Sequence, residues 1–181
     1  MNLIALHGLA GSGKDTVADY LTKYYGYTKI SFAKPLKEII CILTGWSYPF
    51  VNGDIDREKR ETLIHPDYGM TCRQLMQFIG TDLFRNKLHQ DIWVKITKRY
   101  LEEHRGQKIV VTDCRFTNEI NMMKNFNATI ILIKRPSLLT TLDSSKPPHE
   151  SEKNLIINNA IVLVNNGNLN DLYQKIDHLF T

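Results

Sequence analysis

The stretch Gly8-Leu9-Ala10-Gly11-Ser12-Gly13-Lys14-Asp15-Thr16 directly follows the apolar run Leu3-Ile4-Ala5-Leu6, and it decides the fold of this chain. It fits the pattern G-x-x-x-x-G-K of a phosphate-binding loop, in which backbone N–H groups surround phosphate oxygens and the lysine reaches the outer phosphates. Apolar side chains recur behind it at helical spacing, at Val17, Ala18, Leu21 and Tyr24. The pattern predicts a strand, a phosphate-binding loop and a helix whose N-terminus favours anions.

The loop departs from the usual pattern at Asp15, because Ser or Thr usually follows the lysine and binds Mg²⁺ through its hydroxyl. A carboxylate at this position repels a bare triphosphate, so it suggests that Mg²⁺ bridges the two, directly or through water. The alternative is an acidic residue that the helix dipole favours at a helix start. We expect Lys14 to be solvent-exposed and to act by neutralising phosphate charge.

Length and composition favour one domain over residues 1–181, with 43% hydrophobic and 23% charged residues. No apolar run approaches the ~20 residues that span a bilayer, and no signal segment is evident, so we expect a cytoplasmic protein that does not bind membranes. Three cysteines without metal-ligand spacing indicate reduced thiols rather than a zinc site.

The charge pattern argues against nucleic-acid binding. The formal net charge is +4, and the densest charged stretch, 56–61, alternates in sign as a solvated helix face does. A nucleic-acid surface needs a basic patch with aromatic platforms, which this sequence lacks.

Five short apolar, β-rich runs alternate with helical patterns. The runs are nearly continuous rather than alternating in polarity, which is typical of parallel strands covered on both faces. The sequence therefore predicts an α/β fold with a doubly wound, five-stranded parallel sheet. The expected strands are 2–6, 28–32, 108–112, 129–134 and 160–164, and the expected helices are 35–43, 72–79 (capped by Thr71), 91–103 (capped by His89 or Gln90), 117–126 and 170–179.

Two stretches contribute neither strands nor connecting helices to the predicted sheet. Residues 44–70 contain three glycines and two prolines and begin a long excursion, which with the helix that follows covers 44–90. Residues 136–152 contain three prolines and two adjacent serines. Long excursions in a compact domain are usually functional lids or disordered segments, and we interpret the second one as a lid.

Charged residues follow two of the expected strands. Asp113 comes after the apolar residues 109–111, the usual place for a second acidic group near the metal, and Arg115 follows it. Arg135 ends the next strand and is a candidate for an arginine that contacts the transferring phosphoryl group. The alternatives are that Asp113 only caps a helix and that Arg135 is a surface residue before a proline.

The segment 73–85 mixes apolar and polar residues at helical spacing. Arg73 and Gln77 are four apart and therefore share a face, which offers a phosphate-binding guanidinium and an amide suited to a base edge. The apolar members favour a core position: Leu75, Met76, Ile79 and Leu83. Trp93 could stack on a base, although core packing is the more frequent use of such a tryptophan, and His149 falls in the expected lid.

Taken in order, these motifs resemble the phage-type deoxynucleoside monophosphate kinases, a branch of the P-loop nucleoside monophosphate kinases. The resemblance rests on Gly8–Thr16, Ser31-Phe32-Ala33-Lys34-Pro35-Leu36-Lys37, residues 73–85, Asp91-Ile92-Trp93, Val111-Thr112-Asp113-Cys114-Arg115-Phe116 with Asn118-Glu119, and His149-Glu150-Ser151-Glu152. It accounts for Asp15, since Gly-Lys-Asp-Thr is the family's form of the loop. Some relatives carry a basic residue where this chain has Ala10 and Gly11, so in this chain residues outside these two positions must supply the positive charge that neutralises the phosphates.

The resemblance implies ATP as phosphoryl donor, Mg²⁺, and a deoxynucleoside monophosphate as acceptor. It implies that Lys14, Arg115 and Arg135 are catalytic and that Asp15 and Asp113 lie at the metal. The implied ATP site is Gly8, Ala10, Gly11, Ser12, Gly13, Lys14, Asp15 and Thr16. The implied acceptor site within 44–90 and around it is Lys34, Lys37, Arg73, Gln77, Asp82, Arg85 and Trp93, with His149 from the lid.

Two other functions stay open at this point. Animal-type phosphomevalonate kinases look similar in the loop, the Gly-Thr-Asp segment and the Asp-x-Arg strand end. A non-catalytic nucleotide-binding module would keep residues 8–14 but has no use for Arg73, Arg115 and Arg135, which favours an enzyme. The sequence leaves open which bases are accepted, and it leaves open the oligomeric state, a homodimer included.

Overall fold

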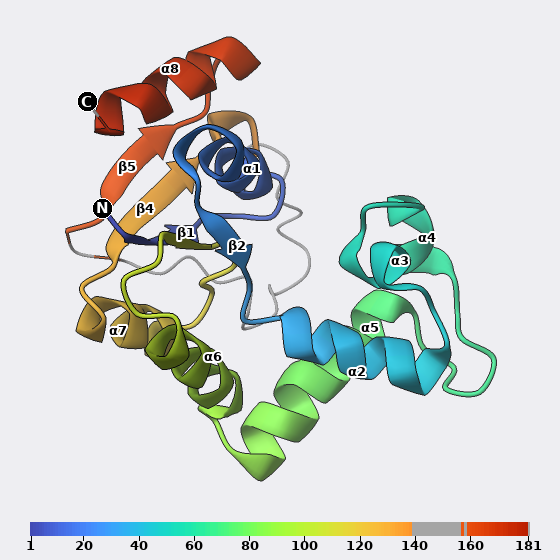
Figure 1. Ribbon diagram of the computed structural model, residues 1–181. Helices are drawn as coiled ribbons and strands as arrows, with labels where there is room; N and C mark the ends of the chain where they lie inside the picture. Colours follow the sequence, from blue (N-terminus) through green and yellow to red (C-terminus); the bar gives the residue numbers. More distant parts are fainter. Residues whose placement is uncertain (139–156, 158, 181) are drawn as a thin grey trace. The chain divides into compact units, whose positions relative to one another are not determined.

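The computed structural model describes residues 1–138, 157 and 159–180 (Figure 1). Contacts within the chain divide it into two compact units, Met1–Ser31 with Lys98–Thr181, and Phe32–Thr97. The first contains the sheet and the phosphate-binding loop, and the second contains the whole of the 44–90 excursion. No helix among the described residues is long and apolar enough to cross a membrane.

The first unit is built on a five-stranded parallel sheet in the order β2-β3-β1-β4-β5. The strands are β1 (Leu3–His7), β2 (Thr28–Ile30), β3 (Ile109–Val111), β4 (Thr129–Lys134) and β5 (Ile161–Val164). In register, Ile4 lies opposite Val110 and Ala5 opposite Ile130. The prediction of a five-stranded parallel sheet is confirmed. Because all strands are parallel, their carboxyl ends meet at one edge, where ligands bind in such folds.

Helices α1 (Lys14–Tyr25) and α8 (Leu169–Phe180) lie on one side of this sheet and α7 (Thr117–Asn125) on the other (Figure 1). A short helical turn, η2 (Pro136–Leu138), follows β4. The core between the sheet and the first two helices buries aliphatic side chains of all three, namely Ile4, Leu6, Val17, Leu21, Val110, Ile131, Ile133, Leu163, Leu172 and Ile176. Leu172 and Ile176 of α8 are buried in this core, and Leu179 of the same helix packs against it.

The second unit is helical. It contains α2 (Lys34–Thr44), α3 (Tyr48–Asn52), α4 (Arg57–Thr62), α5 (Cys72–Gln77), η1 (Phe78–Leu88) and the start of α6 (Ile92–Glu103). Thr71 caps α5 as expected: its hydroxyl accepts a hydrogen bond from the Gln74 N–H, and the Gln74 side chain accepts one from the Thr71 N–H. Before α6, His89 Nδ1 accepts a hydrogen bond from the Asp91 N–H at 3.0 Å.

Two apolar residues are more exposed than the sequence pattern predicts. Leu83 is 44% exposed, so its expected core position is wrong. The reason is that η1 is wound with i→i+5 hydrogen bonds, and this wider turn changes which residues share a face. Tyr24 is 59% exposed at the end of α1, where it packs on Tyr20 at the surface.

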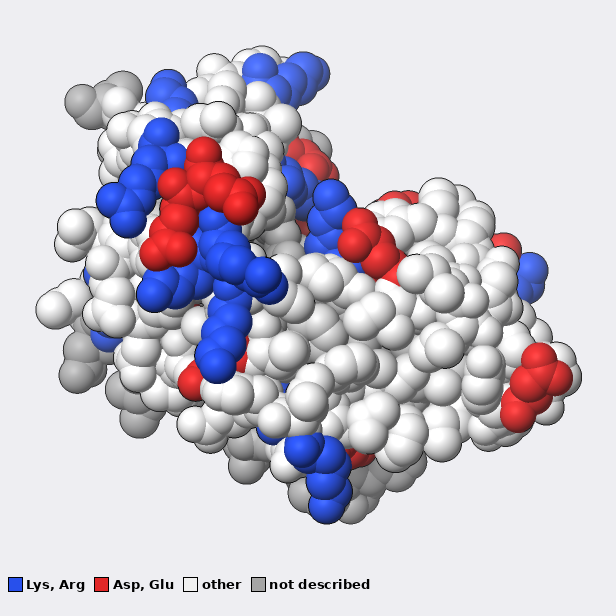
Figure 2. Space-filling model, turned by 60° about the horizontal axis from the view of Figure 1, so that its bottom comes forward, with Lys and Arg blue, Asp and Glu red and all other residues white. Residues whose placement is uncertain are grey.

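Charged side chains of both signs lie next to one another on the face drawn in Figure 2. Within the described residues, Asp56 pairs with Lys59 at 3.4 Å and Lys98 with Glu102 at 3.8 Å. Oppositely charged side chains are therefore neighbours in these two places, and the alternating charges of 56–61 lie on an exposed helix as the sequence predicts.

Candidate active site

The phosphate-binding loop connects β1 to α1 through two glycines that no other residue could replace without strain. Gly8 has φ +150°, and a Cβ there would lie 2.4 Å from the carbonyl oxygen of Ile133 in β4. Gly13 has φ +105° and directly precedes α1. The chain can therefore turn tightly beside β4 and present backbone N–H groups at the start of the helix.

Lys14 is buried within its own loop, with 8% of its surface exposed, so the expectation of an exposed lysine is wrong. Its ammonium turns back and donates hydrogen bonds to the carbonyl oxygens of Gly8 and Leu9, both at 2.8 Å. Burial, and secondarily the nearby charge of Arg115, lowers the pKa of Lys14 to about 8, while Asp15 and Asp113 oppose this shift. The loop thus holds an ammonium group whose hydrogen bonds to two carbonyl oxygens can be replaced by hydrogen bonds to phosphate oxygens.

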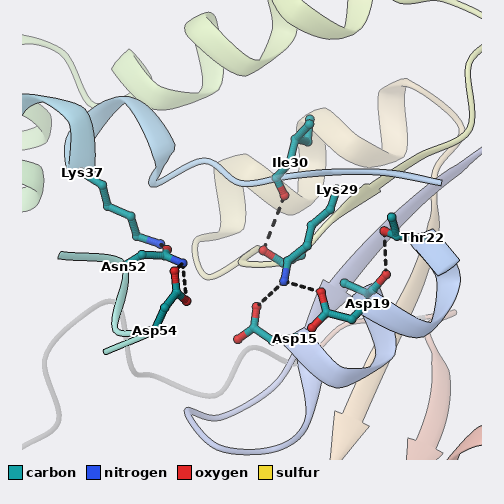
Figure 3. Close-up of polar contacts among 10 residues, drawn as sticks. Asp15, Asp19, Thr22, Lys29, Ile30, Lys37, Asn52 and Asp54 are labelled. Carbon is teal, nitrogen blue, oxygen red and sulfur yellow. Dashed lines mark hydrogen bonds and ion pairs between the residues drawn. The ribbon is translucent and has the colours of Figure 1, made fainter. Parts of the chain in front are cut away.

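Asp15 points outward from the first turn of α1, with 80% of its side chain exposed. Its carboxylate lies 3.4 Å from the ammonium of Lys29 of β2, and Lys29 also pairs with Asp19 at 2.8 Å (Figure 3). Asp15 also influences the charge of Lys14. The carboxylate is therefore close to the loop, accessible to solvent, and partly neutralised by a lysine from the neighbouring strand.

The loop after β3 carries Asp113, Cys114 and Arg115. A buried carboxylate from α7 orders its backbone: Glu119 Oε2 accepts hydrogen bonds from the N–H groups of Arg115 at 2.7 Å and Phe116 at 3.1 Å. Asp113 is half-buried and Arg115 is exposed, and both are close enough to Lys14 to affect its pKa. The charged groups at the ends of β1 and β3 therefore act on one another.

Two further strand ends contact the loop backbone. Arg135, directly after β4, donates a hydrogen bond from Nη1 to the carbonyl of Gly11 at 3.3 Å. Asn165, directly after β5, donates from Nδ2 to the carbonyl of Ser12 at 2.9 Å, and its own N–H bonds to the carbonyl of Lys134. Arg135 thus places a cation at Gly11, where some members of the family that the sequence resembles carry a basic side chain.

The expected acceptor residues lie in the second unit, apart from His149, which is outside the described residues. Arg73 and Gln77 are both half-buried on α5, and Arg73 Nη1 lies 3.5 Å from a carboxylate oxygen of Glu61. On α2, Lys34 is exposed and Lys37 donates a hydrogen bond to Asn52 Oδ1 at 2.7 Å (Figure 3).

Three other expected acceptor residues have different surroundings. Trp93 is 4% exposed, and its indole N–H donates to the carbonyl of Gly80 at 2.9 Å, which favours the core alternative. Arg85 is also buried, and its Nη1 donates to the carbonyl of Gln90 at 3.2 Å. Asp82 is exposed on η1.

Comparison with known proteins shows to which family this sequence belongs. The family model for deoxynucleotide monophosphate kinases matches residues 50–176. The chain belongs to the deoxynucleotide monophosphate kinase family. A protein of Acanthamoeba polyphaga mimivirus, provisionally named as such a kinase, is 33% identical over 97% of this chain and 94% of its own length. The deoxynucleotide monophosphate kinase of Enterobacteria phage T4 is 26% identical over 97% of both chains. The resemblance drawn from the ordered motifs is confirmed.

As a member of this family the protein is an enzyme of the kinase class, whose phosphoryl donor is a nucleotide. Among solved structures, a gluconokinase from Sinorhizobium meliloti 1021 is 12% identical, with a TM-score of 0.49 over 99% of this chain and 95% of that chain. The strand order of the sheet, rather than this weak likeness, carries the fold assignment.

The carboxylates near the loop suit a Mg²⁺ ion that substrate phosphates also hold, rather than a metal ion that protein side chains hold by themselves. The described residues contain no group of three or more His, Cys, Asp or Glu side chains that could hold an ion by themselves. Mg²⁺ in kinases usually keeps several waters and binds one or two carboxylates together with substrate phosphates. Asp15 and Asp113, which both act on Lys14, fit that requirement.

Sequence reasoning assigned no role to Lys29, Glu119 or Asn165. Glu119 had a detectable signal, since an acidic residue at the third position of a helix commonly accepts hydrogen bonds from the free N–H groups at its start. Asn165 follows an apolar strand run, as Asp113 does, and could have been selected by that position. Nothing in the sequence connects Lys29 with Asp15, because their contact depends on where β2 lies beside α1.

Proposed function

We propose that the protein transfers the γ-phosphoryl group of ATP to a deoxynucleoside monophosphate and so produces the diphosphate. The observation that carries this proposal is the arrangement around Lys14. A buried ammonium is held by the loop carbonyls, with Asp113 and Arg115 close enough to shift its pKa. Phosphoryl transfer needs little covalent help from a protein, so positioned charges of this kind supply most of the catalysis.

Each group has a role in this proposal. The N–H groups of the loop and of the α1 start bind the phosphates of ATP, and Lys14 exchanges its two carbonyl partners for their outer oxygens. Arg115 and Arg135 offset the charge that develops on the transferring group. Asp15 and Asp113 would hold Mg²⁺, which when bound supplies a divalent charge between the phosphate oxygens.

The acceptor is proposed to bind residues of the second unit, with Arg73 on its phosphate and Gln77 on its base. A guanidinium suits a phosphate because it offers two parallel N–H donors, and an amide can both donate to and accept from a base edge. Lys34 and Lys37 on α2 are proposed to border the acceptor. His149, which the resemblance implies for the acceptor site, lies outside the described residues.

A coupled assay of ADP release tests this function directly. Each deoxynucleoside and ribonucleoside monophosphate is offered with Mg²⁺ and ATP, and phosphomevalonate is included as the acceptor of the alternative kinase. We expect turnover with at least one deoxynucleoside monophosphate and none with phosphomevalonate. Turnover with phosphomevalonate alone would overturn the proposal, and ATP binding without turnover of any acceptor would indicate a nucleotide-binding module.

A further inference from the structure

His7 is a buried histidine between the sheet and the phosphate-binding loop. It is the last residue of β1, directly before Gly8, and only 4% of its surface is exposed. Its Nδ1 lies 2.7 Å from the carbonyl oxygen of Cys114, which is 107 residues away in the sequence. The Cys114 N–H also bonds to the carbonyl of Leu6 at 3.3 Å. Two hydrogen bonds therefore join the end of β1 to the loop after β3.

This geometry determines which nitrogen of His7 carries the hydrogen. A carbonyl oxygen can only accept a hydrogen bond, so Nδ1 must be the donor, and in a neutral imidazole the lone pair is then on Nε2. Burial has the largest effect on the pKa of His7 and lowers it. The hydrogen bond to Cys114 opposes this shift, but the positive charges of Lys14 and Arg115 add to it, so the pKa stays below its usual value. His7 is therefore neutral, and it can hold the carbonyl without adding a cation to the site.

The bonded carbonyl lies between two charged residues of the proposed mechanism. Cys114 separates Asp113 from Arg115, and its own thiol is buried with a pKa well above the usual value, so its side chain adds no charge. The hydrogen bond to the Cys114 carbonyl thus fixes the turn that carries both charged side chains relative to β1. Displacing that turn would move Asp113 and Arg115 relative to Lys14, and preorganised charges lose their effect when they are misplaced.

We propose that His7 is a positioning residue, whose Nδ1–H holds the Asp113–Arg115 turn against the phosphate-binding loop for phosphoryl transfer. The proposal rests on the function proposed above. It also explains why a polar residue ends β1, a strand whose preceding residues Ile4, Ala5 and Leu6 are fully buried and apolar.

Two substitutions separate the hydrogen bond from the volume of the side chain. His7→Asn keeps an N–H donor at about the position of Nδ1, whereas His7→Leu keeps apolar volume and removes the donor. We expect His7→Leu to lower kcat about tenfold or more, with a smaller change in the KM for ATP, and His7→Asn to recover most of this loss. The smaller effect on KM follows because the loop N–H groups that bind ATP stay in place.

His104 provides a matched control in the same unit. Its Nδ1 also lies against a backbone carbonyl, that of Tyr100 at 2.8 Å, but it lies in the turn directly after α6 and has no place in the proposed mechanism. His104→Leu should leave kcat unchanged, and thermal unfolding of every variant shows whether the fold persists. Equal kcat for His7→Leu and His7→Asn, whether both are normal or both are reduced, would overturn the positioning role.

Nitrogen NMR of histidine-labelled protein gives a readout that does not depend on activity. The resonances that disappear in His7→Asn belong to His7, and we expect them to report a neutral ring protonated at Nδ1. A ring protonated at Nε2 would overturn the inference even in an active enzyme. If wild-type protein turned over no acceptor, the proposed function would fail, while the tautomer would still report on the link between β1 and the Cys114 turn.

Discussion

The ammonium of Lys29 lies between two carboxylates of α1, at 3.4 Å from Asp15 and 2.8 Å from Asp19 (Figure 3). Both aspartates are largely exposed, with 80% and 67% of their side chains accessible, so water weakens these pairs. A weak pair leaves Asp15 available to a metal ion while reducing its repulsion of phosphates. If ATP binds at this loop as proposed, Lys29 would therefore offset part of the negative charge of Asp15 beside its phosphates.

Substitutions at this pair should change how strongly ATP binding depends on Mg²⁺. Removing Mg²⁺ should weaken ATP binding to the wild type, because Asp15 then faces unscreened phosphate. Asp15→Asn should reduce that dependence, and Lys29→Met should increase it. Calorimetry with and without Mg²⁺ measures the effect, and Asp19→Asn is the control, since it removes the other partner of Lys29. If ATP affinity depended equally on Mg²⁺ in the wild type and in Asp15→Asn, Asp15 would be only an acidic residue that the helix dipole favours at a helix start.

Lys14→Ala should abolish turnover, with a loss of at least ~10²-fold in kcat, the scale found for comparable charge-stabilising groups. Circular dichroism and thermal unfolding must accompany the assay, since the substitution also leaves the carbonyls of Gly8 and Leu9 without their ammonium. Near-normal activity in a folded variant is incompatible with phosphoryl transfer at this loop.

ATP binding should take up protons at pH 8. The pKa of Lys14 is about 8 in the free protein, so about half of these side chains are neutral at that pH. Phosphate charge favours the ammonium and raises this pKa, so binding should draw up to about half a proton from the buffer. Calorimetry in buffers with different ionisation enthalpies measures the uptake. Lys14→Met serves as the control, and an uptake as large in that variant would assign the proton to another group.

Arg73 and Gln77 should affect the acceptor differently. Arg73→Ala should weaken all nucleotide acceptors about equally, because it removes a phosphate contact. Gln77→Leu should lower kcat/KM and change the ranking among bases, since a site built to hydrogen-bond its substrate strongly rejects analogues that lack the matching group. Steady-state kinetics across the four common deoxynucleoside monophosphates measures both effects. An unchanged ranking in Gln77→Leu would remove Gln77 from the base site while leaving the kinase function intact.

Short-range features of this protein could be predicted from the sequence because they depend on neighbouring residues. The phosphate-binding loop follows from glycines at set positions between an apolar run and a helical pattern. The cap at Thr71 follows from Gln74 three residues later. The parallel sheet follows from continuous apolar runs separated by helices. The order of several motifs along the chain was sufficient to predict the family.

One exception among these short-range features is η1. Helical spacing predicted a core position for Leu83, but the wider winding of η1 leaves that side chain exposed. Burial also differs among the residues that the sequence assigned to the acceptor site. Trp93 and Arg85 are enclosed and hydrogen-bonded to backbone carbonyls, whereas Gln77, on the same continuous run α5–η1 as Arg85, is half-buried.

Contacts between distant residues were decided only by the tertiary structure. His7 meets Cys114 across 107 residues, Arg135 meets Gly11 across 124, and Asn165 meets Ser12 across 153. Each pair depends on β3 and β4 flanking β1, with β5 beside β4. Hydrophobic periodicity shows that a strand is buried but does not specify which strand lies beside it. The sequence by itself therefore determined the residues of the phosphate-binding loop. The order of the strands determined which distant side chains surround that loop.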